Sequence, residues 1–390
     1  MRKIDIKTYI IKSIEELRVK EMLSMLKKVN IEGNLYKGYE WTSMFPLESL
    51  FLVESKLLSS ISNKEDNILI KVLMAYLSKV KAFEYLEDAF EEIYSEYLLY
   101  IENNEYRYRT VMFLSGIRSE EEIVFDKCKL IPANEEYYGF LCNTWDKMGA
   151  KRTGIFDGSI TETINMASNT ILVSERNLKE ANDLDEVALE AESIIKAIIL
   201  EIGTEKTFSL SPMYTFSYMN KGGMISNIQY IAGLTNREQY KWHNVGDITT
   251  VINSYKRINS MNRDFIPINR LISAISKHSL NDRFLDLMIA LESIFPNIQH
   301  EATYRLALCI ATLLDRRESV YKDMKKLYNQ RSKIVHGTLS CSKKQGIDIE
   351  DYRKLDTILR DVIKIVIDLK NEGIEIESIE EYVMGILLPN

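Results

Sequence analysis

A short segment near the carboxyl end of the chain concentrates side chains that could do chemistry. The segment LYNQRSKIVHG, residues 327–337, contains Arg331, Ser332 and His336, one of four histidines in the chain, and it ends in Gly337. Histidine titrates near neutral pH and can serve as acid or base. Arginine stays charged and presents a planar fork that matches phosphate oxygens. Together these residue types suit the cleavage of a phosphodiester.

RNA is the substrate for which these groups would suffice, because it carries its own nucleophile, the 2′-hydroxyl. Cleavage needs a base to take the 2′-hydroxyl proton, an acid to protonate the departing 5′-oxygen, and a cation for the phosphorane-like charge. His336 is expected in the last turn of a helix, where the helix dipole favours the protonated form and hence the acid role. The mechanism needs no metal, and it excludes DNA, which lacks the 2′-hydroxyl.

The spacing of the segment argues for a site shared between two chains. Arg331 and His336 are five residues apart, which separates them by about 140° around an α-helix. Ser332 and His336 are four apart and share a face. A second copy of the helix across a twofold axis would bring two arginines and two histidines into one cleft. Arg-x4-His alone is a weak pattern, and the alternative interpretation is a buried polar pair that stabilises the fold.

The elements expected around this segment are helices. Ser279 can cap a helix with Asp282 as its capping-box partner. Three further helices are predicted from apolar residues at helical spacing, at about 302–314, at about 319–336 with Gly337 as a left-handed terminating residue, and from about 352 to Gly373. Short connections between such helices favour antiparallel neighbours and hence a small bundle.

The rest of the chain divides into two regions. Residues 1–105 show helical periodicity and are predicted to form a helical N-terminal region. Residues 106–265 are predicted to be a mixed α/β sensor or regulatory region, in which RTVMFLSGI and EEIVFDKCKLI resemble a hairpin and strands at 169–175 and 206–219 flank a helix closed by Gly203. The expected fold is mainly α, with a mixed α/β middle segment and an antiparallel helical bundle over 266–390.

Composition narrows the class of protein. The net charge is −7, yet residues 301–345 hold ten Lys or Arg against four Asp or Glu, which suits a local site that meets phosphates. A solvated helix face would show the same charges. The four cysteines lie far apart, with no histidine at metal-ligand spacing, so no metal, cofactor or disulfide is expected. Charges interrupt every apolar run, so we expect a cytoplasmic protein without a membrane segment.

A longer stretch of sequence resembles a known family. The segments NDRFLDLMIALESIF, EATYRLALCIATLL and VYKDMKKLYNQRSKIVHG are similar, in order and spacing, to the Apea-like branch of the HEPN superfamily. In that branch an ALE helix precedes a YRLAL helix and then a helix that ends in RSkivHG. The match is close over about residues 280–337, and the whole domain would span 266–372. The middle segment, with LSGIRSEEEIVFDKCKLI at residues 114–131, resembles the upstream region of Apea-like proteins much more loosely.

The resemblance implies a HEPN-type bundle that dimerises through its Arg-x4-His helices and cleaves RNA, often in bacterial anti-phage defence, as an abortive-infection protein or a toxin. It makes Arg331 and His336 the catalytic pair and Glu292 the acid that orients Arg331, with Ser332 and Lys333 in support and Gly337 as a structural residue. Active members often have Asn, Asp or His after the arginine, whereas Ser332 is a shorter and weaker polar group. A phage-derived trigger or a neighbouring antitoxin would be the expected regulatory partner.

Two classes of function remain open from the sequence. In the first, the protein is a metal-independent endoribonuclease whose upstream residues sense a trigger or restrain the nuclease. In the second, the HEPN bundle is a non-catalytic dimerisation or RNA-binding module, and the upstream region carries the function. The presence of both Arg331 and His336 favours the first class.

Overall fold

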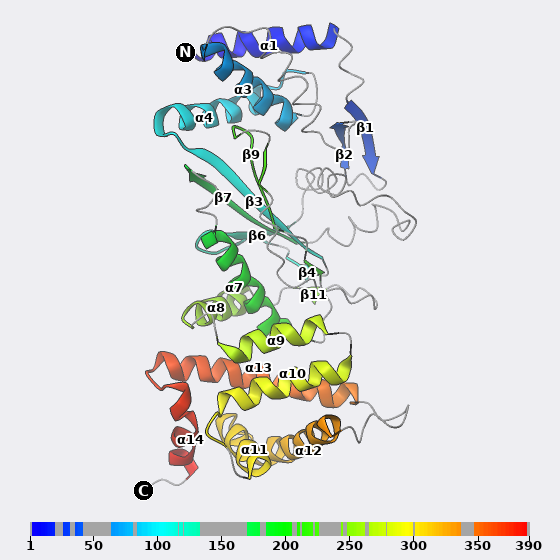
Figure 1. Ribbon diagram of the computed structural model, residues 1–390, viewed down its shortest axis with the longest axis vertical. Helices are drawn as coiled ribbons and strands as arrows, with labels where there is room; N and C mark the ends of the chain where they lie inside the picture. Colours follow the sequence, from blue (N-terminus) through cyan, green and yellow to red (C-terminus); the bar gives the residue numbers. More distant parts are fainter. Residues whose placement is uncertain are drawn as a thin grey trace. The chain divides into compact units, whose positions relative to one another are not determined.

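A computed structural model shows a mostly helical chain with a small antiparallel sheet in the middle, as the sequence predicts (Figure 1). The structure describes residues 2–19, 26–31, 36–41, 64–80, 84–115, 117–119, 121–132, 170–179, 185–204, 209–210, 213–220, 223–225, 243–244, 248–261, 265–277, 279–298, 301–336 and 347–387. Among these residues, no helix is long and apolar enough to cross a membrane.

The chain forms two units that interleave along the sequence. The first comprises Met1–Ser115, Ser119–Ala188 and Ser211–Tyr230, and the second Gly116–Arg118, Leu189–Leu210 and Ile231–Asn390. The predicted boundary between 265 and 266 does not coincide with a unit boundary, because residues 189–210 and 231–265 belong with the C-terminal helices.

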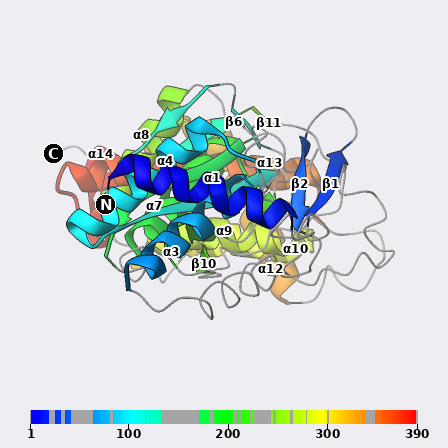
Figure 2. The same ribbon diagram turned by 90° about the horizontal axis from the view of Figure 1, so that it is seen from above.

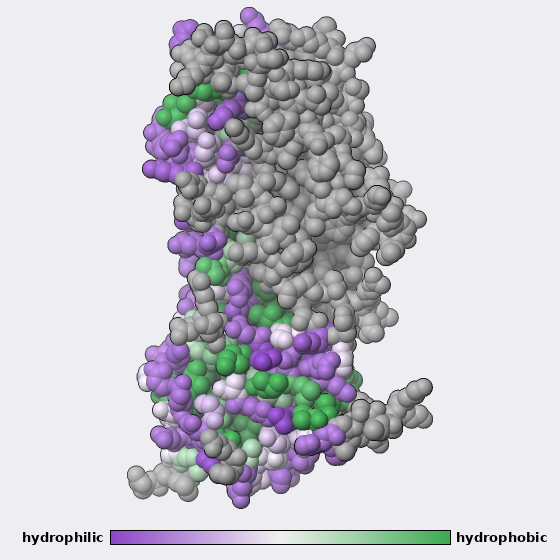
Figure 3. Space-filling model, in the orientation of Figure 1, coloured by the Kyte–Doolittle hydropathy of each residue, from purple (hydrophilic) through white to green (hydrophobic). Residues whose placement is uncertain are grey.

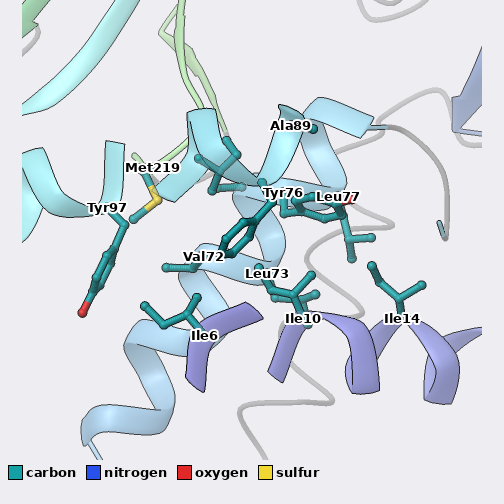
Figure 4. Packing of buried hydrophobic residues seen from close by; sticks show 13 residues of the cluster. Ile6, Ile10, Ile14, Val72, Leu73, Tyr76, Leu77, Ala89, Tyr97 and Met219 are labelled. Carbon is teal, nitrogen blue, oxygen red and sulfur yellow. The ribbon is translucent and has the colours of Figure 1, made fainter. Parts of the chain in front are cut away.

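Three helices of the first unit share one apolar core. They are α1 (Lys3–Val19), α3 (Lys64–Val80) and α4 (Glu87–Asn103). Ile6, Ile10 and Ile14 recur every four residues and so form one buried face of α1. Figure 4 shows these isoleucines pointing toward Tyr76 and its neighbours on α3. Figure 2, which looks down on α1, shows it lying across α3.

The predicted all-helical region 1–105 is wrong in one segment. Strands β1 (Leu26–Ile31) and β2 (Tyr36–Trp41) form an antiparallel pair there. Their sequences, LKKVNI and YKGYEW, include β-branched and aromatic residues, which favour strands. The apolar residues before Leu26 suggested a continuing helix, but local propensity of the following residues decides the structure from Leu26 onward.

The sheet of the first unit is built on two long antiparallel strands. They are β3 (Tyr106–Ser115) and β7 (Thr170–Leu178). The order is β10-β9-β3-β7-β6-β5, with the shorter strands being β5 (Ile123–Val124), β6 (Lys129–Pro132), β9 (Tyr214–Ser217) and β10 (Gly223–Ile225).

The strands predicted at 169–175 and 206–219 are present, but the predicted hairpin is wrong. β3 pairs with β7 and β9, and the hairpin lies within 121–132, between β5 and β6. β3 is ten residues long and contains the apolar run VMFL (111–114), so it takes a central place with strand partners on both edges, whereas β5 has two residues and can pair only briefly.

The second unit is helical apart from short strands. It contains β4 (Ile117–Arg118), β8 (Ser209–Leu210), β11 (His243–Asn244), α8 (Ile248–Asn259), α9 (Ile266–Ser276), α10 (Leu280–Ile294), α11 (Ala302–Leu313), α12 (Arg317–Val335), α13 (Ile349–Asn371), a 3-10 turn (Ile376–Ser378) and α14 (Ile379–Leu387). Most of α7 (Asp185–Ile202) also belongs to it. The three helices predicted after residue 300 are confirmed within three residues at each described end.

Contacts among the C-terminal helices position α12. α10 packs against α9, α12 and α13, and α11 packs against α12 (Figure 1). Leu287 and Leu291 of α10 and Leu359 of α13 are fully buried. Ser279 occupies the N-cap position of α10 as predicted, but its side chain makes no capping hydrogen bond. In Figure 3 apolar side chains reach the surface over α9 and α10, among hydrophilic ones.

A buried polar cluster joins α7 to α13. Gly203 ends α7 with a φ of +87°, a left-handed conformation that favours glycine, as predicted for a helix terminus. The next residue, Thr204, donates its backbone N–H to Asp356 Oδ1 at 2.9 Å. Arg360 donates to Asp356 Oδ2 and to the carbonyl oxygen of Glu201. The end of α7 is thus held by side chains of α13.

Candidate active site

The candidate site begins at the last turns of α12. Val335 ends the helix, and His336 takes the C-cap position, where its backbone N–H donates to the carbonyl oxygen of Ser332 at 3.0 Å. His336 is exposed, Ser332 is half-buried and Lys333 is exposed. Gly337 lies outside the described residues, so its left-handed conformation stays a prediction.

Arg331 of α12 is held by Glu292 of α10. Its Nη2 donates a hydrogen bond to Glu292 Oε2 at 3.2 Å, and its Nε lies 3.2 Å from Glu292 Oε1 in an ion pair. Glu292 Oε1 is buried and accepts no hydrogen bond from the described residues. The two residues are 39 positions apart in sequence, and the packing of α10 on α12 brings them together.

Tyr328 forms a third side of this site. It precedes Arg331 by three residues on α12, and the guanidinium carbon lies 5.8 Å from the centre of its ring. A cation at this distance over an aromatic face is attracted to it. Burial, and next the carboxylate of Glu292, raise the pKa of Tyr328. The phenol therefore stays protonated in the physiological range. The sequence argument overlooked this residue, although its three-residue spacing from Arg331 on one helix would have indicated it.

Arg331 keeps part of its hydrogen-bonding capacity. A guanidinium has five N–H donors. Within the described part of the chain one of them, on Nη2, makes a hydrogen bond, and the side chain remains 29% exposed. The arginine is thus oriented by a carboxylate and still able to meet another anion.

The structure does not bring His336 to the Arg331–Glu292 pair. No contact among the described residues joins the imidazole of His336 to either residue. Five helical steps place its side chain about 140° from Arg331 around α12. In one chain, therefore, the arginine and the histidine of the motif face different directions.

Asp351 fixes the same part of α12 from another side, and the sequence argument missed it. This carboxylate is 4% exposed in the first turn of α13, and it accepts hydrogen bonds from Lys326 Nζ and Gln330 Nε2, both at 2.6 Å. Burial acts to raise the pKa of Asp351, but the two hydrogen bonds outweigh it and lower the pKa. No local pattern pairs residues 21 and 25 positions away, so only packing reveals this contact.

Among the described residues, no group of three or more His, Cys, Asp or Glu is arranged to hold a metal ion. Cys128 and Cys309 are buried. Comparison of the chain with protein-family models, with curated proteins and with solved structures finds no match. The functional argument therefore rests on the residues and their geometry.

Proposed function

We propose that the protein is a metal-independent endoribonuclease of the HEPN type, with Arg331 and His336 as its catalytic pair. In this proposal a 2′-hydroxyl attacks the adjacent phosphorus, the 5′-oxygen leaves, and the products carry a 2′,3′-cyclic phosphate and a 5′-hydroxyl. His336 would protonate the departing oxygen, and Arg331 would stabilise the charge on the phosphorane-like oxygens.

One observation carries the proposal. Arg331 is oriented by Glu292, is partly exposed and keeps hydrogen-bond donors free within the described residues, while an exposed histidine follows at the end of the same helix. An arginine prepared in this way can bind a phosphate without first being ordered. Ser332 and Lys333 would contribute a polar group and a positive charge beside it.

A HEPN-type antiparallel bundle is the finer fold that we propose for the C-terminal helices. The three segments that carry the resemblance fall on consecutive helices: ALE on α10, YRLAL on α11 and RSKIVHG at the end of α12. The contacts of α10 with α12 and of α11 with α12 support this arrangement.

We further propose that the site is completed in a homodimer. Arg331 and His336 diverge around α12, so one helix cannot place both on the same phosphate. Two copies related by a twofold axis could offer Arg331 from one chain and His336 from the other. In an anti-phage or toxin role, a phage-derived trigger or a neighbouring antitoxin would then act on the residues upstream of the helices.

The second candidate is a non-catalytic dimerisation or RNA-binding module, with the function carried upstream. The Arg331–Glu292 ion pair favours this candidate to the extent that it would stabilise the packing of α10 on α12 even without catalysis. The two candidates differ in what His336 does, because its side chain is exposed and no hydrogen bond or ion pair joins it to other described residues.

Incubation of purified protein with RNA in EDTA tests the proposal. Cleavage should persist under chelation, and His336→Ala should lower the rate by about 10²–10⁴-fold, the usual contribution of general acid–base catalysis. Lys322→Ala is the matched control on α12, since Lys322 is exposed and paired only with Glu318. Cleavage at equal rates by wild type and His336→Ala would favour the non-catalytic module, and 3′-hydroxyl product ends would rule out the mechanism.

A further inference from the structure

The face of α12 that carries His336 also carries aromatic and cationic side chains nearer the start of the helix. Tyr321, Lys325, Tyr328, Ser332 and His336 follow one another at intervals of three or four residues. At 100° per residue they fall within an arc of about 80° around the helix axis. This face therefore runs from the proposed catalytic histidine back to Tyr321.

Two tyrosines form an exposed pair at the far end of this face. Tyr304 of α11 packs edge-on against Tyr321 of α12, with ring centres 6.0 Å apart and planes inclined by 82°. Tyr304 is 50% exposed, and Tyr321 is half-buried. By comparison, Tyr76 and Tyr97 in the core of the first unit are 0% and 4% exposed. The exposed aromatic surface of this pair, next to a lysine, could stack against a flat ligand.

Lys325 supplies a positive charge that no carboxylate of the described residues neutralises. Its Nζ lies 5.4 Å from the centre of the Tyr321 ring, and within the described part of the chain it forms no ion pair. The neighbouring lysines differ in this respect. Lys322 pairs with Glu318, and Lys326 pairs with Asp351. The uncompensated lysine of these three is the one that lies over the exposed aromatic pair.

We infer that Tyr304, Tyr321 and Lys325 form an accessory binding site for single-stranded RNA. An unpaired base would stack on the exposed tyrosine surface, and Lys325 would meet the phosphate beside it. Stacking of bases on aromatic side chains combined with nearby cations is how proteins hold single strands without reading their sequence. This inference rests on the proposed function and names the part of the substrate that the second site holds.

The separation between the two sites sets the length of RNA needed to reach both. Ten residues separate Tyr321 from Arg331, which corresponds to about 15 Å along the helix at 1.5 Å per residue. A stacked strand advances about 3.4 Å per nucleotide, so the stacked base would lie roughly four or five nucleotides from the cleaved bond. A substrate with two nucleotides on either side of that bond could not reach the tyrosines.

Binding of a fluorescent 12-nucleotide 2′-O-methyl RNA, which cannot be cleaved by 2′-hydroxyl attack, tests the site directly. Tyr321→Leu and Tyr304→Leu should each weaken binding about 5- to 100-fold, the range that one stacked base provides. Tyr321→Phe should bind like wild type, because the ring remains. Lys325→Ala should reduce the slope of log affinity against log salt by about one, and Lys322→Ala should leave it unchanged.

Cleavage of two substrates then separates this inference from the proposed function. Tyr321→Leu should raise KM for a 20-nucleotide RNA and leave kcat/KM for a four-nucleotide RNA unchanged. If wild type fails to cleave either RNA but the leucine variants still bind the 12-mer more weakly, the RNA site stands and the catalytic proposal fails. If wild type cleaves and both leucine variants bind the 12-mer as tightly as wild type, the RNA site is overturned.

A protein partner on this face is the competing outcome. Analytical ultracentrifugation of Tyr304→Leu distinguishes an RNA site from a protein interface. Tyr304 is 50% exposed, so its replacement should disturb the fold little. A variant that loses a dimer while binding RNA with unchanged affinity would assign the tyrosines to a protein interface and overturn the inference. Equal thermal unfolding midpoints for the variants and wild type would show that weaker RNA binding does not come from misfolding.

Discussion

Two arginines in different units of the molecule have similar neighbours but differ in how accessible they are to a further anion. Arg109 of β3 and Arg331 of α12 both pair with a glutamate on a helix, and both lie within 6 Å of the centre of a tyrosine ring, at 5.0 Å and 5.8 Å respectively. They differ in how many carboxylates surround them and in how far water reaches them.

Three carboxylates surround Arg109. Its side chain is 11% exposed, Nη2 donates to Glu92 Oε1 at 2.7 Å, and Nη1 lies 2.7 Å from Glu96 Oε1. Nε lies 3.7 Å from Glu175 on the neighbouring strand, so three carboxylates share one cation. Burial and three neighbouring carboxylates leave this guanidinium little access to a further anion, and we assign the cluster to the stability of the sheet and α4.

One carboxylate lies beside Arg331, and its side chain is more exposed than that of Arg109. Its side chain is 29% exposed, and Glu292 engages one edge of the guanidinium. The comparison teaches that an arginine–glutamate pair by itself does not distinguish a structural residue from a catalytic one. The number of neighbouring carboxylates and the exposed fraction make the distinction, because a phosphate needs access to the guanidinium and competes with the carboxylates already beside it.

The largest expected effect is on stability at Arg109. Arg109→Ala should lower the free energy of unfolding by about 3–5 kcal/mol, because it leaves the buried carboxylate of Glu96 without its cation. Urea unfolding measures this loss. Arg107→Ala is the control on the same strand, since its partner Glu175 is 55% exposed, and it should cost less than about 1 kcal/mol. Equal losses in the two variants would contradict the structural role of Arg109.

The next effect is on RNA cleavage at Arg331. Arg331→Ala should lower the single-turnover rate in EDTA by about 10²–10³-fold, as for removal of one group that stabilises transition-state charge. Its free energy of unfolding should fall by only about 1 kcal/mol, because the ion pair is partly exposed. Arg316→Ala, which removes an exposed arginine before α12, should leave the rate unchanged. A rate unchanged in Arg331→Ala would remove the difference between the two arginines.

A smaller effect is expected at the carboxylate that orients Arg331. Glu292→Gln keeps an acceptor oxygen but loses the charge, and it should lower kcat about tenfold, since one charge-assisted hydrogen bond is worth on the order of 1.5 kcal/mol. KM for RNA should change little if Glu292 only positions the arginine. A higher KM with unchanged kcat would instead indicate that Glu292 influences substrate binding. The kcat and KM of Ser293→Ala, an adjacent control, should match wild type.

The smallest effect is on the pH dependence of the free energy of unfolding, which should have opposite signs for one carboxyl group in each unit. Burial raises the pKa of Glu96 above its ordinary 4.5, so wild type should gain stability relative to Glu96→Gln as pH falls toward 4.5. Hydrogen bonds from Lys326 and Gln330 outweigh burial and lower the pKa of Asp351 below 3.8, so wild type should lose stability relative to Asp351→Asn as pH falls below 3.8. Urea unfolding at several pH values measures both differences, and two differences of the same sign would contradict the assignment.

Local patterns predict the helices around the site well. Apolar residues at three- and four-residue intervals indicate α11, α12 and α13, because a helix that packs on one side needs a continuous apolar face. Gly203 was predicted from its place after such a face, and its positive φ explains why a glycine is there. Strand pairing was harder, since β3 and β7 are joined by register between residues more than 50 positions apart.

In the candidate site, too, local spacing was predictable from the sequence and long-range contacts were not. The sequence places Arg331, Ser332 and His336 on one helix end and fixes the angle between them, since helical geometry depends only on spacing. Glu292 beside Arg331 was expected from the resemblance, and the structure places it there, but its catalytic role stays a prediction. Asp351 could not be predicted from sequence, because a polar contact between helices depends on which helices meet and at what height.

Residue order thus establishes which segments are helices, where they end and which side chains share a face. Packing establishes which charges are neutralised. The sequences next to Arg109 and Arg331 do not predict how many carboxylates lie around each arginine. The carboxylates come from other elements, up to 66 positions away, and burial sets how strongly each one acts. The tertiary structure therefore distinguishes the buried arginine among three carboxylates from the more exposed arginine beside one, because electrostatic environment is a property of three-dimensional neighbours.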